Sequence, residues 1–181
     1  MRTQLKSNIS KNDDMQPFKI LISACLFGDN VRYDGNNKLL EHPILSRWKK
    51  DDCLFPVCPE VAGGLPVPRP AAEIQSNQQG RISIETIDGL DVSSAFSLGA
   101  ECTLKLCLNN DIKIAILTDG SPSCGSQTIH DGSFQSKKIM GMGITTKLLR
   151  ENNISVFSEG QIQQAYDLYL KLIDLPKKTH Q

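Results

Sequence analysis

The 181 residues are enough for one domain with a sizeable core, and a hydrophobic fraction of 39% is ordinary for a soluble globular protein. Basic and acidic residues balance at 20 each, so no broad positive field would attract nucleic acid or a membrane surface. This balance argues against a nucleic-acid polymer as partner and favours a small molecule.

Nothing in the sequence is typical of a targeting or membrane-spanning segment. Residues 1–16 are polar and lack the apolar core of a secretory signal, so we expect a flexible leader there and a short tail at 176–181. No apolar run approaches the length of a membrane span. The sequence therefore predicts a cytoplasmic protein with one domain over residues 17–175, in which the six cysteines stay reduced.

Strands and helices are predicted to alternate along this domain. In chain order they are a strand at 20–25, a helix at 42–50, a strand at 53–57, a helix at 91–109 capped by Asp91, a strand at 112–117, a helix at 144–151, a strand at 154–157 and a helix at 161–173. Residues 59–72 are rich in proline and glycine, so we expect no regular structure there. The alternation at 81–87 predicts a short hairpin or edge strand, and residues 119–132 are predicted to form a loop. This order predicts an α/β fold, an open and mostly parallel Rossmann-like sheet with helices on both faces.

Cys25, Cys58 and Cys124 each follow a predicted strand. Because the carboxyl ends of parallel strands form the crevice where ligands bind, we expect these thiols to meet there. Three thiols would make a soft-metal site with one coordination position open. Burial of all three as ordinary core cysteines remains an alternative on spacing alone, because the paired-cysteine signatures of common metal sites are absent.

The other three cysteines are poor partners for such a site. Cys102 and Cys107 lie in one predicted helix and point about 140° apart at 3.6 residues per turn. Cys53 lies at the opposite end of a strand from Cys58, about 16 Å away at 3.3 Å per residue. We therefore predict Cys53, Cys102 and Cys107 to be core residues.

Several sequence blocks carry a resemblance to a known family. They are Ile22-Ser23-Ala24-Cys25-Leu26, Arg32-Tyr33-Asp34-Gly35, Val57-Cys58-Pro59-Glu60-Val61 with Gly63-Gly64-Leu65-Pro66, Pro68-Arg69-Pro70, and Ser121-Pro122-Ser123-Cys124-Gly125. In this order they resemble the TudS-type thiouracil desulfidases, over roughly residues 19–158.

This resemblance implies a 4Fe-4S cluster held by Cys25, Cys58 and Cys124, with a fourth iron that has no protein ligand. It also implies that Glu60 is the catalytic acidic residue and that Ser121 assists it. The implied reaction is the non-redox removal of sulfur from a thiolated pyrimidine, thiouracil or 4-thiouridine monophosphate. The products would be the oxo base and sulfide.

The residues themselves admit this chemistry. An iron with an open position is a Lewis acid for a thiocarbonyl sulfur, and the polarised ring carbon can then be attacked by water. Glu60, two residues beyond a thiol, would take a proton, and Ser121 would relay it or position the water. Each has a structural alternative: Glu60 as an acceptor of loop amides, and Ser121 as a turn or cap residue before Pro122.

The sequence suggests five further residues for substrate contact: Arg32, Tyr33, Asp34, Arg69 and His130. Either arginine suits a substrate phosphate, although a salt bridge with Asp34 or Glu73 explains it equally well. Tyr33 and Asp34 would hold the base, or Asp34 simply begins a turn. His130 departs from the family pattern, in which a tyrosine is commoner, and faces either substrate or solvent.

Two weaker features and one rival function remain. The amides of residues 141–145 could bind an anion before a helix, but tight backbone packing is the favoured interpretation. The pair Lys137-Lys138 is interpreted as a solvated loop. The rival function is a non-catalytic metal-binding or redox-sensing module, in which zinc or a labile cluster fills the same three thiols.

Overall fold

The computed structural model describes residues 18–76 and 82–174, so the predicted leader at 1–16 and tail at 176–181 lie outside the described residues. Its main sheet has four parallel strands in the order β2-β1-β5-β8. They are β1 (Ile20–Ser23), β2 (Leu54–Val57), β5 (Ile114–Leu117) and β8 (Ser155–Ser158). The central strands β1 and β5 are buried along their whole length, as expected for strands covered on both faces.

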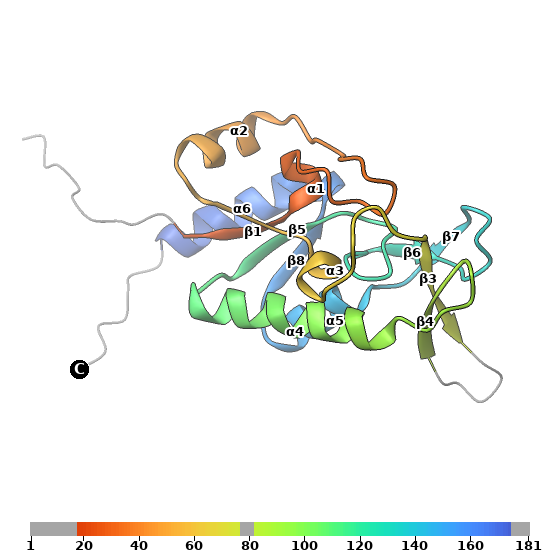
Figure 1. The fold of residues 1–181 in the computed structure, drawn as a ribbon. Helices are drawn as coiled ribbons and strands as arrows, with labels where there is room; N and C mark the ends of the chain where they lie inside the picture. The colour runs from red at the N-terminus through yellow and green to blue at the C-terminus, as the bar shows by residue number, and fades with distance from the viewer. Residues whose placement is uncertain (1–17, 77–81, 175–181) are drawn as a thin grey trace, which may run out of the picture.

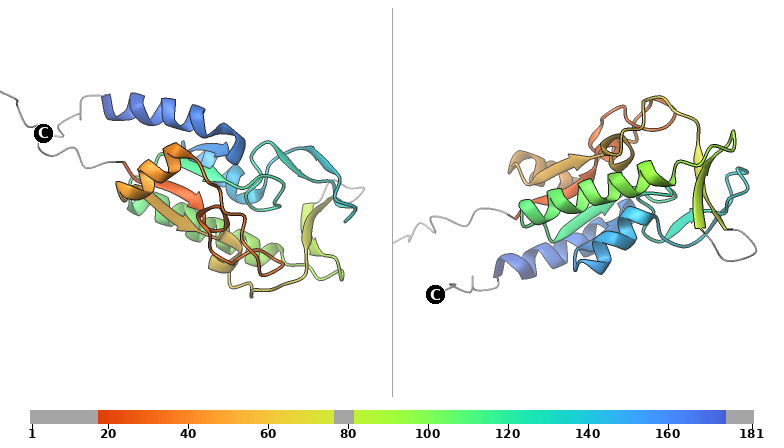
Figure 2. Two further views of the ribbon diagram at one scale, coloured as in Figure 1. Left: turned by 90° about the horizontal axis from the view of Figure 1, so that it is seen from above. Right: turned by 60° about the horizontal axis from the view of Figure 1, so that its bottom comes forward.

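Helices cover both faces of this sheet (Figure 1). They are α2 (Pro43–Lys50) and α6 (Ile162–Asp174) on one face and α4 (Ser93–Asn109) and α5 (Ile144–Glu151) on the other. Ile22 and Ile116 pack with the first pair, whereas Leu21 and Leu117 pack with the second, because successive side chains of a strand point to opposite faces. Figure 2 shows α6 and α4 on opposite sides of the strands, so the predicted open Rossmann-like α/β fold is confirmed.

Two antiparallel ribbons lie together at one end of the molecule, far from the ends of the described chain (Figure 1). They pair β3 (Ala72–Ser76) with β4 (Ile82–Thr86), and β6 (Thr128–His130) with β7 (Lys138–Met140). The alternation at 81–87 predicted a short hairpin or edge strand, which matches β4, but the partner strand β3 was not predicted. The second ribbon was missed, because strands of three residues are too short to give a periodic pattern.

Short helices follow β1 and β2 where the sequence analysis expected a strand end and irregular chain. They are α1 (Ala24–Phe27) and α3 (Pro59–Ala62), and a 3-10 turn, η1 (Glu159–Gln161), follows β8. The expectation of no regular structure over 59–72 was therefore wrong at its start, since proline at the first helical position favours a helix.

The helix α3 crosses α4 at very close range. A Cβ added to Gly63 would lie 2.0 Å from the carbonyl oxygen of Ala95, and one added to Gly99 would lie 2.0 Å from that of Pro59. Glycine at both positions therefore lets the two backbones touch. This contact fixes the place of Cys58, which directly precedes α3.

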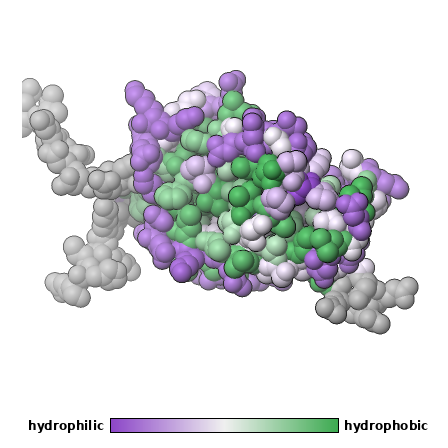
Figure 3. Space-filling view, viewed as in Figure 1, coloured by the Kyte–Doolittle hydropathy of each residue, from purple (hydrophilic) through white to green (hydrophobic). Residues whose placement is uncertain are grey.

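The two cysteines of α4 differ in burial. Cys107 lies on the buried side of the helix, so its predicted core position is confirmed. The predicted core position of Cys53, which precedes β2, is also confirmed. Cys102 is exposed, so the prediction of a core position was wrong. Ile87, Leu90 and Leu98 also expose apolar surface. Figure 3 shows hydrophobic areas interspersed with polar ones on one face of the molecule. In the part of the chain that the structure describes, no helix is both long and apolar enough to cross a membrane.

Candidate functional site

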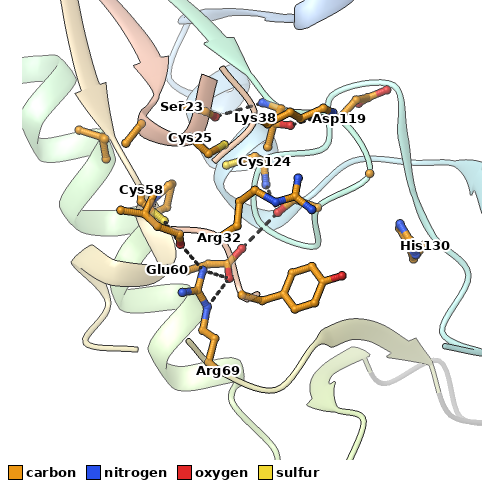
Figure 4. Close-up of a pocket in the computed structure, with 18 of the residues that line it drawn as sticks. Ser23, Cys25, Arg32, Lys38, Cys58, Glu60, Arg69, Asp119, Cys124 and His130 are labelled. Atoms are coloured by element: carbon orange, nitrogen blue, oxygen red, sulfur yellow. Dashed lines mark hydrogen bonds and ion pairs between the residues drawn. The ribbon is translucent and has the colours of Figure 1, made fainter. Parts of the chain in front are cut away.

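A cavity of about 300 Å³ lies at the carboxyl ends of β1, β2 and β5. It is the crevice that the parallel topology predicts for a ligand. The turns that leave these strands form its inner wall, and β6 and β7 reach its rim. Cys25, Cys58 and Cys124 all line it, grouped at one end with His130 at the other (Figure 4).

Each thiol comes from a different element. Cys25 lies in α1 and Cys124 in the turn after β5, and both are nearly inaccessible to solvent. Cys58 is half-buried before α3, and its Sγ faces the carbonyl oxygen of Val31 at 3.8 Å. Three cysteines far apart in the sequence therefore line one cavity, as the sequence analysis predicted from their positions after three strands.

Burial raises the pKa of all three thiols. Burial, and next the neighbouring Cys58, raise the pKa of Cys25 to about 11. Burial also raises the pKa of Cys58, and burial followed by the charges of Cys58, Glu60 and Cys25 raises that of Cys124 well above its ordinary value. A metal that binds here must therefore displace protons from the sulfurs.

The three cysteines share one cavity. Among residues 18–76 and 82–174, no group of three or more His, Cys, Asp or Glu side chains is arranged to hold a metal ion. Cys25, Cys58 and Cys124 nevertheless line the same cavity, and cysteine thiolates are the ligands that iron–sulfur clusters take.

Glu60 is held between an arginine and a hydroxyl at the cavity wall. Its Oε2 accepts hydrogen bonds from Arg69 Nε at 2.9 Å and Nη2 at 2.7 Å, and its Oε1 accepts one from Ser121 Oγ at 3.3 Å. Arg69 is itself fixed by the carbonyl oxygens of Val31 and Pro66. Glu60 therefore bonds side chains rather than the loop amides considered in the sequence analysis, and Arg69 pairs with Glu60 rather than with Asp34 or Glu73.

Ser121 combines a turn role with a position beside the carboxylate. Its Oγ accepts hydrogen bonds from the amides of Ser123 at 3.0 Å and Cys124 at 3.1 Å, while the hydroxyl donates to Glu60. Ser121 therefore does have the turn role that was considered as an alternative. The turn role uses the oxygen as an acceptor, so the hydroxyl proton still points to Glu60. The same turn fixes the backbone of Cys124.

The amides before α5 hold this turn instead of an anion. Gly143 donates to the carbonyl oxygen of Gly125 at 2.8 Å, and Ile144 donates to that of Pro122 at 3.0 Å. A Cβ on Gly143 would lie 2.3 Å from the carbonyl oxygen of Ser123. Tight backbone packing, the favoured interpretation of residues 141–145, is confirmed.

The remaining predicted contact residues fall into two groups. Arg32 and Tyr33 line the cavity, with the guanidinium 5.7 Å from the ring centroid. Asp34 is not part of the cavity lining; it accepts from Arg32 at 3.4 Å and caps the amide of Asn36 at 3.1 Å. His130 lines the far rim, where its Nδ1 lies 3.2 Å from Glu73 Oε1.

Three charged cavity residues were missed by the sequence analysis: Lys38, Asp119 and Lys138. Lys38 bonds Thr118 Oγ1 and Glu159. Burial alone would raise the pKa of Asp119, but amide hydrogen bonds, chiefly from residues 127 and 126, hold it below its ordinary value. Asp119 stands two residues before Ser121, and this proximity to a candidate residue is a signal in the sequence. Nothing in the local sequence distinguishes Lys138 from Lys137, and both side chains are exposed.

The sequence profile of the 2-thiouracil desulfurase family matches residues 20–161. The chain belongs to this family. Among solved structures, this family member is similar to a 4Fe-4S-dependent thiouracil desulfidase, TudS, at 46% identity and a TM-score of 0.80, over 86% of this chain and 99% of that one. It is also 35% identical over 148 residues to the uncharacterized protein YbbK of Bacillus subtilis (strain 168), covering 79% of this chain and 97% of YbbK. The family resemblance noted from the sequence is confirmed.

Proposed function

We propose that this protein removes sulfur from a thiolated pyrimidine, such as thiouracil or 4-thiouridine monophosphate, at a 4Fe-4S cluster held by Cys25, Cys58 and Cys124. The observation that carries this proposal is the convergence of three thiols from three elements on one cavity, beside a carboxylate and a hydroxyl. The description of the similar TudS as a 4Fe-4S-dependent thiouracil desulfidase supports it.

A bound cluster with one iron free of protein ligands would supply a Lewis acid for the thiocarbonyl sulfur. Glu60 then acts as general base on a water molecule at the ring carbon, through the hydroxyl of Ser121 or directly. A bond forms between the water oxygen and this carbon while the carbon–sulfur bond breaks. Both protons of the water end on the sulfide, so no electron donor or acceptor takes part.

Arg69 acts through Glu60. Its guanidinium donates two hydrogen bonds to one carboxylate oxygen, which orients the other oxygen towards Ser121. These bonds also occupy Arg69, so we assign it to the orientation of Glu60 and not to a substrate phosphate. Arg32 and Tyr33 form the flat wall against which we propose the base stacks, and Asp34 orients Arg32.

Anaerobic reconstitution with iron and sulfide, followed by assay with 4-thiouracil, tests this function. We expect a broad iron–sulfur absorbance band and release of sulfide as the thio-base is consumed. The variant Cys124→Ser should lose both, whereas Cys102→Ser, which changes an exposed cysteine outside the cavity, should keep both. Equal sulfide release by Cys124→Ser would contradict the proposal, and a cluster without turnover would favour the redox-sensing module instead.

A further inference from the structure

Ser23 is a polar residue at the end of the central strand β1, and it is only 2% exposed. It lines the cavity at the end where Cys25 and Cys124 lie (Figure 4). A buried hydroxyl costs free energy unless it is hydrogen-bonded. The partners of this hydroxyl therefore indicate what Ser23 does in the cavity.

The pleat of β1 turns Ser23 towards Cys124. Successive side chains of a strand point to opposite faces, so Ser23 shares a face of the sheet with Leu21. Leu21 and Cys124 belong to the same core cluster, on the face that α4 and α5 cover. Cys25 packs with Ile22 in the cluster on the other face. Of the two buried thiols, Cys124 is therefore the one on the side of Ser23.

The first partner of Ser23 occupies its oxygen as an acceptor. Thr118 directly follows β5, beyond the last residue pair that joins β1 to β5, Ile22 with Ile116. Its amide donates to Ser23 Oγ at 3.0 Å. Since this bond uses a lone pair of the oxygen, the hydroxyl proton is left for a second partner. A hydroxyl that accepts a hydrogen bond also becomes a better donor, because hydrogen-bonded groups polarise one another.

The second partner is the thiol of Cys124. Burial, followed by the neighbouring charges, raises the pKa of Cys124, whereas a hydrogen bond from the Ser23 side chain acts in the opposite direction and lowers it. A hydrogen bond with this effect favours the thiolate, which is the form that binds metal. The two side chains also line one end of the same cavity and lie on one face of the sheet.

We propose that Ser23 is a positioning residue for the reaction, which acts through Cys124 by donating a hydrogen bond to its thiolate when the cluster is bound. This inference rests on the proposed function and adds a residue that acts on a cluster ligand. A hydrogen bond to a cysteine sulfur draws electron density from the metal centre, and such bonds help to set its reduction potential. Ser23 thereby keeps the open iron a stronger acceptor for a thiocarbonyl sulfur.

The reduction potential of the reconstituted cluster, measured by anaerobic dye-mediated titration, tests this role without turnover. Reduction adds negative charge to the cluster sulfurs, so the hydrogen bond from Ser23 stabilises the reduced form more than the oxidised form. Ser23→Ala should therefore lower the potential. We expect a roughly tenfold change in the one-electron equilibrium constant, which is about 59 mV. An unchanged potential in Ser23→Ala would overturn the proposal.

Two further variants separate the hydrogen bond from packing. Ser126→Ala is the matched control, because Ser126 is also buried, lies two residues after Cys124 and has a hydroxyl without a hydrogen-bond partner in the described part of the chain. It should leave the potential unchanged. Ser23→Thr keeps a hydroxyl at a strand position, which suits threonine, and should restore most of the potential. A shift in either variant equal to that of Ser23→Ala would contradict the proposal.

Resonance Raman spectra give a second readout that packing alone would not move. After reconstitution in heavy water, deuterium replaces the proton of the hydrogen bond, so the iron–sulfur stretching bands of the cysteine ligands should shift. Ser23→Ala should lose part of this isotope shift, whereas Ser126→Ala should keep it. An equal isotope shift in both variants would mean that the Ser23 hydroxyl does not bond a ligand sulfur.

Sulfide release distinguishes a failure of this inference from a failure of the proposed function. With 4-thiouracil, Ser23→Ala should show a lower kcat than the unmodified protein, since the open iron is a weaker Lewis acid. If the cluster forms but the unmodified protein releases no sulfide, the proposed function fails, whereas the potentials of the variants still decide the role of Ser23. Normal turnover with equal potentials in all variants would overturn the role of Ser23 alone. A protein that binds no cluster would overturn both.

Discussion

At the scale of single residues, the proposed chemistry depends on a carboxylate whose two oxygens face different partners. Oε2 of Glu60 is engaged by Arg69, so Oε1 is the oxygen that meets Ser121 and the cavity. Both members of the ion pair are largely buried, with exposed side-chain fractions of 16% for Glu60 and 6% for Arg69. Changes to Glu60 must therefore separate a loss of chemistry from the cost of an unpaired buried charge.

We expect Glu60→Gln to keep the cluster band but to lower kcat by about 10²–10⁴, the usual contribution of a general base. The variant should also be less stable, by up to about 3–5 kcal/mol, because Arg69 loses its charge partner. The double variant Glu60→Gln/Arg69→Gln removes both charges, so urea unfolding should show part of the stability restored. Turnover should stay low, and recovery of turnover in the double variant would exclude Glu60 as the base.

At the scale of elements, the site depends on how closely α3 packs on α4. The two helices touch through glycines, and α3 carries Cys58 at its start and Glu60 in its first turn. The sequence showed the Gly63-Gly64 pair, but a glycine pair does not reveal its partner helix. The contact with Gly99 is long-range and follows only from the fold.

Gly99→Ala tests this contact, because the new methyl would lie 2.0 Å from the carbonyl oxygen of Pro59. The backbone of α3 must then move, and we expect a loss of about 1–3 kcal/mol, as for overpacked cores, with weaker retention of the cluster. Gly160→Ala is the control, since its Cβ would meet only Ser158 Oγ at an ordinary 3.7 Å. Urea unfolding and cluster absorbance measure both effects, and equal behaviour of the two variants would show that the α3–α4 spacing is not critical.

At the scale of the whole molecule, the sequence predicted the parallel sheet because its strands are short, buried apolar runs that alternate with helical periods. It predicted the meeting of three thiols because strand ends in such a sheet share one edge. It did not predict the ribbon β6–β7, and so it missed Lys138, whose place in the cavity depends on pairing between two strands of three residues each. Arg69 and Glu60 were both predicted beside the crevice, but their ion pair was not, because pairing between a short helix and a loop depends on their final packing.

In the proposed function, the three thiols also connect three strands of the sheet to the cofactor. Cys25, Cys58 and Cys124 follow three adjacent strands, β1, β2 and β5, so a group bound by all three would add a link between them to the sheet pairing and to the Ser121–Glu60 hydrogen bond. A group that binds only the folded chain stabilises it by about 2.7 kcal/mol at a hundredfold excess over its dissociation constant. For a chain of this size, that corresponds to a rise in Tm of roughly 5–10 °C.

We therefore expect reconstituted protein to melt several degrees above the same protein treated with an iron chelator, under anaerobic conditions. The difference should vanish in Cys124→Ser, which retains two of the three ligands, and persist in Cys102→Ser, whose thiol is exposed on α4. Scanning calorimetry of the three proteins, each reconstituted and chelator-treated, separates cofactor linkage from a direct effect of each substitution on folding, since only the former depends on iron. If chelation left the Tm of the unmodified protein unchanged, the three cysteines would not hold a group that bridges these strands.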